Sequence, residues 1–283
     1  MPRARRSTPQ QRVAVIIPAK NEAGRIASTI RATAALPAVD LVLVVDDGSA
    51  DATGQISREA GAVVVRHPHN RGKAEAMETG AAVVAMRDTD DDPPRHLLFL
   101  DADLGDSAAN AGPLIAPIMA EEADLTIAVL PAQHGAGGHG FVVNLARRAI
   151  ARAAGWVPKA PLSGIRCLTR KAFESATPLA RGWGVETAKT IALGRAGFDV
   201  QEIPCELRHR ASGKDLRSQM HRAAQYRDVL LAVSARGLRI AAQHTGRAAS
   251  GLASGEWSRQ GRGRRREQER PGQRETHTRP SQT

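Results

Sequence analysis

The feature that most constrains this chain is an apolar run at residues 97–100 that leads directly into Asp101, Ala102 and Asp103. Short apolar runs bounded by polar residues are typical of fully buried strands. In an open α/β sheet, ligands bind where the chain leaves the carboxyl ends of the strands. Two carboxylates at such a point, separated by one small residue, can hold a hard divalent cation against a phosphate. The run therefore predicts both a buried strand and a ligand site at its end.

The segments before residue 97 repeat this pattern. Three other apolar runs predict strands, at 13–17, 41–45 and 62–65. Helical spacing separates these runs, with the first helix expected from about residue 22, and the joints between them are short and rich in Gly and Asp. Alternating strands and helices predict an α/β fold with a doubly wound, mostly parallel sheet flanked by helices. No G-x-G-x-x-G motif follows the first run, so the usual dinucleotide fingerprint is absent.

The second half of the chain also contains expected strands and helices, but their order is less regular. We expect strands at 124–130, 163–168 and 200–207. We expect helices at 116–122, at 141–154 and from 171. A loop at 181–186 should lead into a helix that ends near 196, and a final amphipathic helix is expected at 215–242. The acidic run at 88–92 is interpreted as a solvated loop.

The net charge of +11 is concentrated in the two ends of the chain. Residues 1–12 contain four Arg and no acidic residue, and residues 246–283 contain nine Arg and four Glu, which leaves +2 for everything between. The Gly, Ser, Arg and Gln content from 245 onward predicts disorder. We expect a basic disordered tail at 1–12, a domain with a first half at 13–130 and a second half with C-terminal helices at 131–244, and a disordered Arg-rich tail at 245–283.

The sequence also bears on the location of the protein. Its two cysteines, Cys167 and Cys205, are too few and too isolated for a disulfide framework or a zinc site, and we expect both to be reduced. No segment approaches the roughly 20 apolar residues of a membrane span, and no apolar region of a secretory signal follows Arg6. We therefore expect a cytoplasmic protein. Contact with the inner membrane surface through the basic tail stays open, whereas binding to nucleic acid is not expected.

Several motifs occur in order at the expected strand ends. The first four are Ile17-Pro18-Ala19-Lys20-Asn21-Glu22, Val45-Asp46-Asp47-Gly48-Ser49-Ala50-Asp51, Gly72-Lys73 and Leu100-Asp101-Ala102-Asp103-Leu104. Together they resemble family 2-like glycosyltransferases of the GT-A fold. Two later stretches, Ser163-Gly164-Ile165-Arg166 and Gly182-Trp183-Gly184-Val185-Glu186, resemble the acceptor half of glucosyl-3-phosphoglycerate synthases and of polyprenyl-phosphate sugar transferases. The resemblance covers about residues 13–235 and implies a nucleotide-sugar-binding half at 13–130 and an acceptor-binding half at 131–244.

The resemblance implies a divalent metal, Mg²⁺ or Mn²⁺, bound by Asp101, Asp103 and His209. Carboxylates can place such a cation on the diphosphate of a nucleotide sugar, where it neutralises the leaving group. A neutral imidazole can complete the site, although His is less usual for Mg²⁺ than for Mn²⁺. The alternatives are that the aspartates cap the turn after their strand and that His209 is a solvated loop residue.

The resemblance also implies a set of donor-binding residues. A carboxylate in these positions can accept hydrogen bonds from a base N–H and from ribose hydroxyls. Lys73 follows Gly72 in a polar loop and can meet a phosphate, or it can be an ordinary surface lysine. Turn chemistry is expected to explain at least one of the Asp46–Asp47 pair. The donor-binding set is Pro18, Ala19, Asn21, Glu22, Asp46, Asp47, Lys73, Asp101 and Ala102.

A third implied set faces the acceptor. Guanidinium groups pair bidentately with phosphate or carboxylate, so arginines beside the sugar suit an anionic acceptor; surface salt bridges are the alternative. Glu186 either orients the acceptor or the sugar, or is a helix-start carboxylate favoured by the helix dipole. The catalytic set is Asp103, Glu186 and Arg166, and the acceptor-binding set is Ser163, Gly164, Arg208, Arg210 and Lys214.

We therefore predict a metal-dependent glycosyltransferase that moves a sugar from a nucleotide-sugar donor of the UDP-glucose or GDP-mannose type to a small anionic acceptor such as 3-phosphoglycerate. A polyprenyl-phosphate sugar transferase is the alternative within the resemblance, and a homodimer is compatible with either. A sugar-phosphate nucleotidyltransferase would need a Gly-rich basic loop after the first strand, which is absent. The alternative outside enzymology is a non-catalytic, basic-tailed adaptor on a transferase fold.

Overall fold

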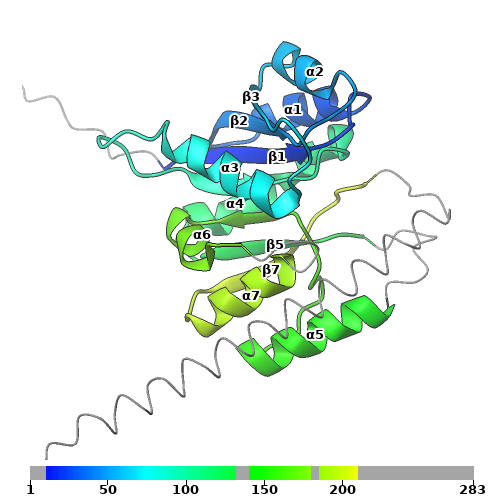
Figure 1. Ribbon diagram of the computed structural model, residues 1–283. Coiled ribbons are helices and arrows are strands. Elements are labelled where there is room, and N and C mark those ends of the chain that lie inside the picture. Colours follow the sequence, from blue (N-terminus) through cyan, green and yellow to red (C-terminus); the bar gives the residue numbers. More distant parts are fainter. Residues whose placement is uncertain (1–10, 132–139, 180–184, 210–283) are drawn as a thin grey trace, which may run out of the picture. The chain divides into compact units, whose positions relative to one another are not determined.

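The computed structural model describes residues 11–131, 140–179 and 185–209. In this part of the chain a mixed sheet of seven strands has the order β3-β2-β1-β4-β6-β5-β7 (Figure 1). Strand β6 runs antiparallel to its neighbours β4 and β5, and all the other pairs are parallel. The strands are β1 Val13–Ala19, β2 Val39–Asp46, β3 Val63–Arg66, β4 His96–Phe99, β5 Leu125–Val129, β6 Arg166–Leu168 and β7 Val200–Pro204.

Helices cover both faces of this sheet. The described helices are α1 Ile26–Ala34, α2 Thr53–Glu59, α3 Lys73–Ala85, the 3₁₀ helix η1 Gly105–Ala111, α4 Gly112–Met119, α5 Gly140–Ala154, α6 Arg170–Ala176 and α7 Val185–Arg195. Helices α1, α2, η1 and α4 pack on one face, and α3, α6 and α7 pack on the face turned to the viewer in Figure 1. This arrangement confirms the predicted fold class, a mostly parallel sheet with flanking helices.

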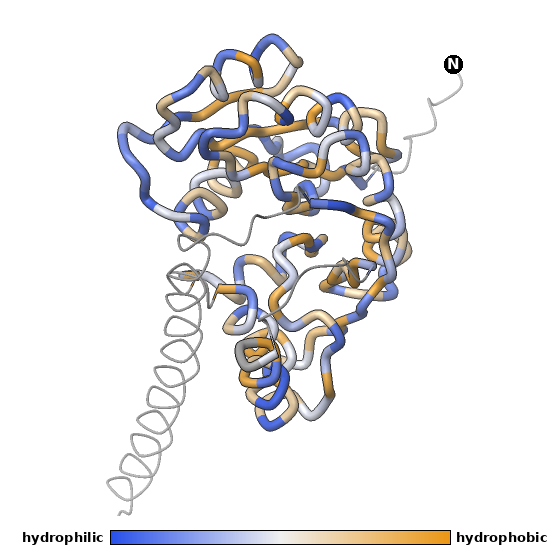
Figure 2. Tube along the Cα trace, turned by 90° about the vertical axis from the view of Figure 1, so that its right-hand side faces the viewer, coloured by the Kyte–Doolittle hydropathy of each residue, from blue (hydrophilic) through white to orange (hydrophobic). Residues whose placement is uncertain are grey.

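The core lies on both sides of β1. Val13, Val15 and Ile17 join one hydrophobic cluster, whereas Ala14 and Ile16 join the other, and all five are fully buried. Alternate side chains of a strand point to opposite faces, so a strand buried on both sides must be apolar throughout. Figure 2 shows the same pattern, with orange strands enclosed by elements that are blue on the outside. The unbroken apolar runs of the sequence therefore correspond to the central strands.

The predicted elements occur in the expected order, and several of them differ in extent. Helix α1 begins at Ile26 and not near residue 22, because residues 21–23 bond to the loop after β2 and to the first residue of α2. The helix expected at 116–122 begins earlier, at residue 112, where Pro113 in its first turn favours a helix start. Strand β6 is shorter than the expected 163–168.

Some predicted segments lie outside the described residues. They are residues 1–10 of the first basic tail, the Arg-rich tail at 245–283, the helix at 215–242 and residues 181–184 of the loop before α7. The domain boundaries stay a prediction. Among the described residues, none of the helices combines the length and the apolar character that crossing a membrane would need.

The acidic loop at 88–92 was interpreted as solvated, which is wrong for Asp88. Its two carboxylate oxygens each lie 2.7 Å from a guanidinium nitrogen, one of Arg95 and one of Arg170, and its side chain is only 12% exposed. Arg95 in turn donates to Asp40 at 2.8 Å, and this hydrogen bond raises the pKa of Arg95. Asp88, the first residue of the loop, thus links it to the start of β4 and to α6 at the amino edge of the sheet.

Replacing Asp88 with alanine should lower the free energy of unfolding by about 3 kcal/mol, because it leaves two largely buried guanidinium groups without their shared partner. Urea unfolding at neutral pH measures this loss. Asp91→Ala removes an exposed carboxylate of the same loop and should change the free energy by less than about 0.5 kcal/mol. Equal effects of the two substitutions would contradict a specific role for Asp88.

Candidate functional site

The loops that follow β1 and β2 form one connected surface. The backbone N–H of Asn21 donates to Ser49 Oγ at 3.0 Å, and the Ala50 N–H donates to Asn21 Oδ1 at 2.8 Å. The Glu22 N–H donates to Thr53 Oγ1 at 2.8 Å. Asn21 adopts a left-handed conformation with φ 57°, which Asn tolerates better than most residues. Two of the predicted donor-binding motifs are therefore held against each other by reciprocal hydrogen bonds.

Helix α1 fixes the loop after β4, which carries the two aspartates of the opening motif. Thr29 Oγ1 donates to the carbonyl of Ala102 at 3.0 Å and accepts from the Gly105 N–H at 2.8 Å. Arg25 donates to the carbonyl of Asp103 at 3.0 Å. The backbone of this loop is thus bonded to α1, and the side chains of Asp101 and Asp103 remain partly exposed, at 26% and 23%.

The carboxylates of Asp46 and Asp47 are both buried and both fix loops of the site. Asp46 Oδ1 accepts from the Ser49 N–H at 2.9 Å. Asp47 accepts from the backbone N–H groups of residues 71 and 72 at 2.8 Å each and lies 2.7 Å from His67 Nδ1. Burial raises the pKa of Asp47, but these hydrogen bonds outweigh it and the pKa is lowered. Turn chemistry, expected for at least one of the pair, describes Asp46, whereas Asp47 holds the distant loop before α3, and their contact with a nucleoside stays a prediction.

Lys73 connects the donor half to the acceptor half. Its ammonium group donates to Asp101 Oδ1 at 2.8 Å and lies 3.4 Å from Glu186 Oε1. Burial opposes protonation, but the charges of the two carboxylates raise the pKa of Lys73 above its usual value. A Cβ built on Gly164 would lie 2.2 Å from Lys73 Nζ. Gly164 thus leaves the space through which the lysine reaches Glu186.

His209 lies against the two aspartates, as the resemblance implied. Its Nδ1 is 3.0 Å from Asp103 Oδ1, and its Nε2 is 3.7 Å from Asp101 Oδ2. The chain reaches this place because the Arg208 N–H donates to Ser107 Oγ in η1 at 3.0 Å. The hydrogen bond to Asp103 raises the pKa of His209, although burial acts in the opposite direction. The side chain is 29% exposed, so it is not a freely solvated loop histidine.

The donor chemistry of Asp101, Asp103 and His209 fits a divalent cation. Carboxylate oxygens suit Mg²⁺ and Mn²⁺, and an imidazole suits Mn²⁺ better. Across the described ranges, no group of three or more His, Cys, Asp or Glu side chains stands arranged to hold a metal. The three side chains instead bond to one another and to Lys73. Asp101, Asp103 and His209 would hold the metal with the imidazole in its neutral form, because a metal-bound histidine is deprotonated.

The raised pKa of His209 gives a pH dependence in the metal-free protein. The ordinary pKa of histidine is about 6.5, and a higher pKa in the folded state means that the ion pair stabilises the fold below that value. This stabilisation should disappear as pH rises through the raised pKa. In EDTA, the free energy of unfolding of the wild type should therefore exceed that of His209→Ala by more at about pH 6 than at about pH 8.5. His69→Ala, which removes an exposed histidine, is the control variant.

Arg166 is fully buried and joins the start of β6 to α7. Its Nε donates to the carbonyl of Ser163 at 2.7 Å, and its Nη1 donates to the carbonyl of Glu186 at 3.0 Å and to Thr190 Oγ1 at 2.8 Å. Burial lowers the pKa of Arg166 to about 10. The structure thus gives the predicted catalytic arginine a fixed place beneath Glu186, which is itself only 6% exposed.

The other predicted site residues differ in how exposed they are to solvent. Ala102 is buried, whereas Pro18 and Glu22 are partly buried and Arg208 is exposed. Arg210 and Lys214 lie outside the described residues. Sequence reasoning missed the residues that hold the loops in place, because a Thr or Ser on a helix carries no signal for a distant backbone partner. It also missed a buried lysine of α7. The missed residues are Arg25, Thr29, Ser107 and Lys189.

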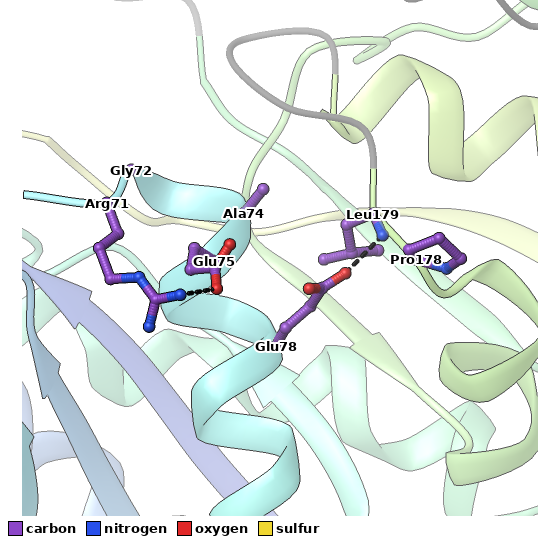
Figure 3. A pocket seen from close by; sticks show the side chains of 7 residues that line it. All are labelled: Arg71, Gly72, Ala74, Glu75, Glu78, Pro178 and Leu179. Carbon is purple, nitrogen blue, oxygen red and sulfur yellow. Dashed lines mark hydrogen bonds and ion pairs between the residues drawn. The ribbon is translucent and has the colours of Figure 1, made fainter. Parts of the chain in front are cut away.

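A pocket of about 410 Å³ lies beside the first turns of α3 (Figure 3). In Figure 3, Arg71 pairs with Glu75, and Glu78 Oε1 accepts from the Leu179 N–H at 2.5 Å. The pocket is thus built from the segment that contains Lys73 and from the chain after α6. Its lining residues are Arg71, Gly72, Ala74, Glu75, Glu78, Pro178 and Leu179.

Residues 14–173 match glycosyl transferase family 2, and the chain belongs to this family. Glycosyltransferase AglJ of Haloferax volcanii is 29% identical over 210 residues, which span 72% of this chain and 65% of AglJ. The chain therefore covers less than two thirds of that relative. Two of the strands predicted to carry ligand residues, β2 and β4, lie within the family match.

Solved structures of glucosyl-3-phosphoglycerate synthase from Mycobacterium tuberculosis have the same fold. The complex with phosphoglyceric acid has a TM-score of 0.64 and 25% identity, covering 80% of both chains. The complex with Mg²⁺ and UDP also has a TM-score of 0.64, with 26% identity over 80% of this chain and 79% of the other. The GT-A fold and the family resemblance predicted from the sequence are both confirmed.

Proposed function

We propose that this chain is a metal-dependent glycosyltransferase that moves a sugar from a nucleotide-sugar donor to a small anionic acceptor. The observation that carries the proposal is the convergence of Asp101, Asp103 and His209 at the carboxyl end of β4, with Lys73 and Glu186 beside them. These side chains come from both halves of the chain. The arrangement combines a candidate cation site with a carboxylate that can orient a hydroxyl group.

Asp101, Asp103 and His209 would hold Mg²⁺ or Mn²⁺. When bound, the cation supplies Lewis-acid stabilisation of the departing diphosphate. Asp101 and Lys73 would orient the sugar, because each carries a polar group that is already fixed by its neighbour. The connected loops after β1 and β2 would form the surface on which the nucleoside lies. The crevice outside the strand ends is the usual ligand position in sheets of this kind.

The proposed donor is of the UDP-glucose or GDP-mannose type, and the proposed acceptor is of the 3-phosphoglycerate type. The likeness to glucosyl-3-phosphoglycerate synthase supports this choice, since that protein was solved with UDP-glucose, Mn²⁺ and phosphoglyceric acid together. The same protein was also solved with glycerol 3-phosphate. Both of these ligands are small phosphorylated molecules. Such molecules fit an acceptor half that contains buried cationic side chains.

A screen of UDP- and GDP-sugars against the purified chain, with and without Mn²⁺, tests the proposal. Release of the nucleotide diphosphate should require metal and should increase with 3-phosphoglycerate, and a polyprenyl phosphate serves as the competing acceptor. A chain without residues 246–283 should retain donor hydrolysis. If no nucleotide sugar turns over or stabilises the protein, the adaptor interpretation is favoured and the proposal fails.

A further inference from the structure

His67, the residue that follows β3, is a buried histidine that the proposed function does not use. Its side chain is only 4% exposed. Its Nδ1 lies 2.7 Å from Asp47 Oδ1, and its Nε2 lies 3.0 Å from Thr79 Oγ1. An ionised carboxylate can only accept hydrogen bonds, so Nδ1 donates to Asp47, and in the neutral ring Nε2 accepts from the Thr79 hydroxyl. His67 therefore joins the loop after β2 to α3.

The carboxylate that His67 contacts supports the turn that leads into α3. Asp47 Oδ1 accepts from the Arg71 N–H and Asp47 Oδ2 from the Gly72 N–H, both at 2.8 Å. Gly72 has φ 93°, a conformation that residues with a side chain rarely adopt, and it carries no side chain that could cap the helix. The turn is therefore held from outside, by a residue of another loop.

The charge of Asp47 depends in part on His67. Burial raises the pKa of Asp47, whereas the hydrogen bond from the Arg71 N–H and then that from His67 lower it, and the pKa is lowered overall. An ionised carboxylate accepts two N–H groups and a ring N–H together, because each of its oxygens has two lone pairs. His67 thus helps to keep Asp47 in the form that holds the turn.

Lys73 is the first residue after this turn, and its side chain needs an accurate position. Its ammonium group donates to Asp101 Oδ1 at 2.8 Å and lies 3.4 Å from Glu186 Oε1. The side chain passes Gly164 so closely that a Cβ there would lie 2.2 Å from Lys73 Nζ. A hydrogen bond of this length tolerates only a small displacement. A shift of the turn before α3 would therefore move the ammonium group away from one carboxylate or both.

We propose that His67 is a positioning residue for sugar transfer, which acts through Asp47 to set the place of the Lys73 ammonium group between its two carboxylates. The inference deepens the proposed function and rests on it. The Nδ1 contact carries this role, because Asp47 holds the turn directly before Lys73. The Nε2 contact reaches Thr79, six residues further along α3, and stabilises the packing of the helix.

Two substitutions of His67 separate its two ring nitrogens. The amide nitrogen of His67→Asn takes the place of Nδ1 and keeps a donor to Asp47, whereas the amide of His67→Gln takes the place of Nε2 and loses that donor. In His67→Gln, kcat should fall about tenfold while KM for UDP-glucose with Mn²⁺ stays within about twofold, because a misplaced group slows the reaction more than it weakens binding. His67→Asn should keep kcat within about threefold of wild type. Urea unfolding shows that both variants fold.

A second measurement does not depend on sugar transfer. The two carboxylates raise the pKa of Lys73, so its acetylation by acetic anhydride, followed by mass spectrometry, should be slow in the wild type. His67→Gln should accelerate this acetylation about tenfold, as expected if the pKa of Lys73 falls by about one unit, because the pairing is weakened and more free amine is present. His67→Asn should not accelerate it. A wild type that transfers no sugar would refute the proposed function, and the acetylation rates would still decide the role of His67.

His69→Gln is the matched control, because it makes the same change at an exposed histidine two residues along the loop. It should resemble the wild type in both measurements. When Lys73 is already methionine, His67→Gln should cause no further loss of kcat, since both changes act on one group. Equal kcat in His67→Asn and His67→Gln, unchanged Lys73 acetylation in His67→Gln, or a loss confined to KM for UDP-glucose would each overturn the inference.

Discussion

Replacing Asp103 with alanine should reduce sugar transfer by about 10²–10³-fold, the loss typical of one group that stabilises transition-state charge. Asp103 is the carboxylate that binds His209, at 3.0 Å, and its loop is fixed by hydrogen bonds to α1. Its removal takes one oxygen ligand from the candidate cation site and leaves His209 without its hydrogen-bond partner. Steady-state rates with saturating Mn²⁺ and donor measure the effect.

The companion substitutions make this result specific. Asp103→Asn keeps the shape of the side chain but removes its charge, and it should lose nearly as much activity as the alanine variant. Asp106→Ala removes an exposed carboxylate of η1, three residues further along, and should retain wild-type rates within about twofold. Comparable activity of Asp103→Ala and wild type would show that the diphosphate is neutralised elsewhere in the protein.

Much of the fold follows from local sequence patterns. The apolar runs of β1, β2 and β4 are buried on both faces, so burial leaves a continuous signal that needs no knowledge of distant partners. The same logic predicts where polar residues after these strands converge, since parallel strands end at one edge of the sheet. Asp101 and Asp103 follow from this reasoning alone. The contact of His209 with them does not, because it depends on the path of the chain after β7.

Other features of the site depend on tertiary contacts that leave no local pattern. Asp47 was expected to face a ligand or its own turn, yet it holds the loop before α3, more than twenty residues away in sequence. Arg166 resembles a surface arginine suited to an anion, but it is fully buried against α7. Lys189 follows Glu186 at the spacing of an exposed helical ion pair, whereas both side chains are buried. A charged residue in a sequence does not report the side of the helix that packing will cover.

Replacing Lys73 with methionine should lower turnover by about 10²-fold, because Lys73 is the group that joins Asp101 to Glu186 and fixes both. Without its ammonium group, the two carboxylates lose their shared counter-ion, at 2.8 and 3.4 Å. Glu186 is nearly buried and has the greater need of that charge. Metal-dependent transfer rates measure the loss. Normal rates in Lys73→Met would mean that Asp101 and Glu186 act independently of each other.

Gly164 offers an independent way to break the same link. Its backbone has no left-handed φ that would require glycine, so Gly164→Ala should fold normally, but the new Cβ would lie 2.2 Å from Lys73 Nζ. The flexible lysine must move, and activity should fall to nearly the level of Lys73→Met. The double variant should then lose no more than either single one, since both remove one interaction. Gly140→Ala, where a Cβ meets nothing within 4 Å, is the control. Additive losses would show that Gly164 serves the acceptor directly and not through Lys73.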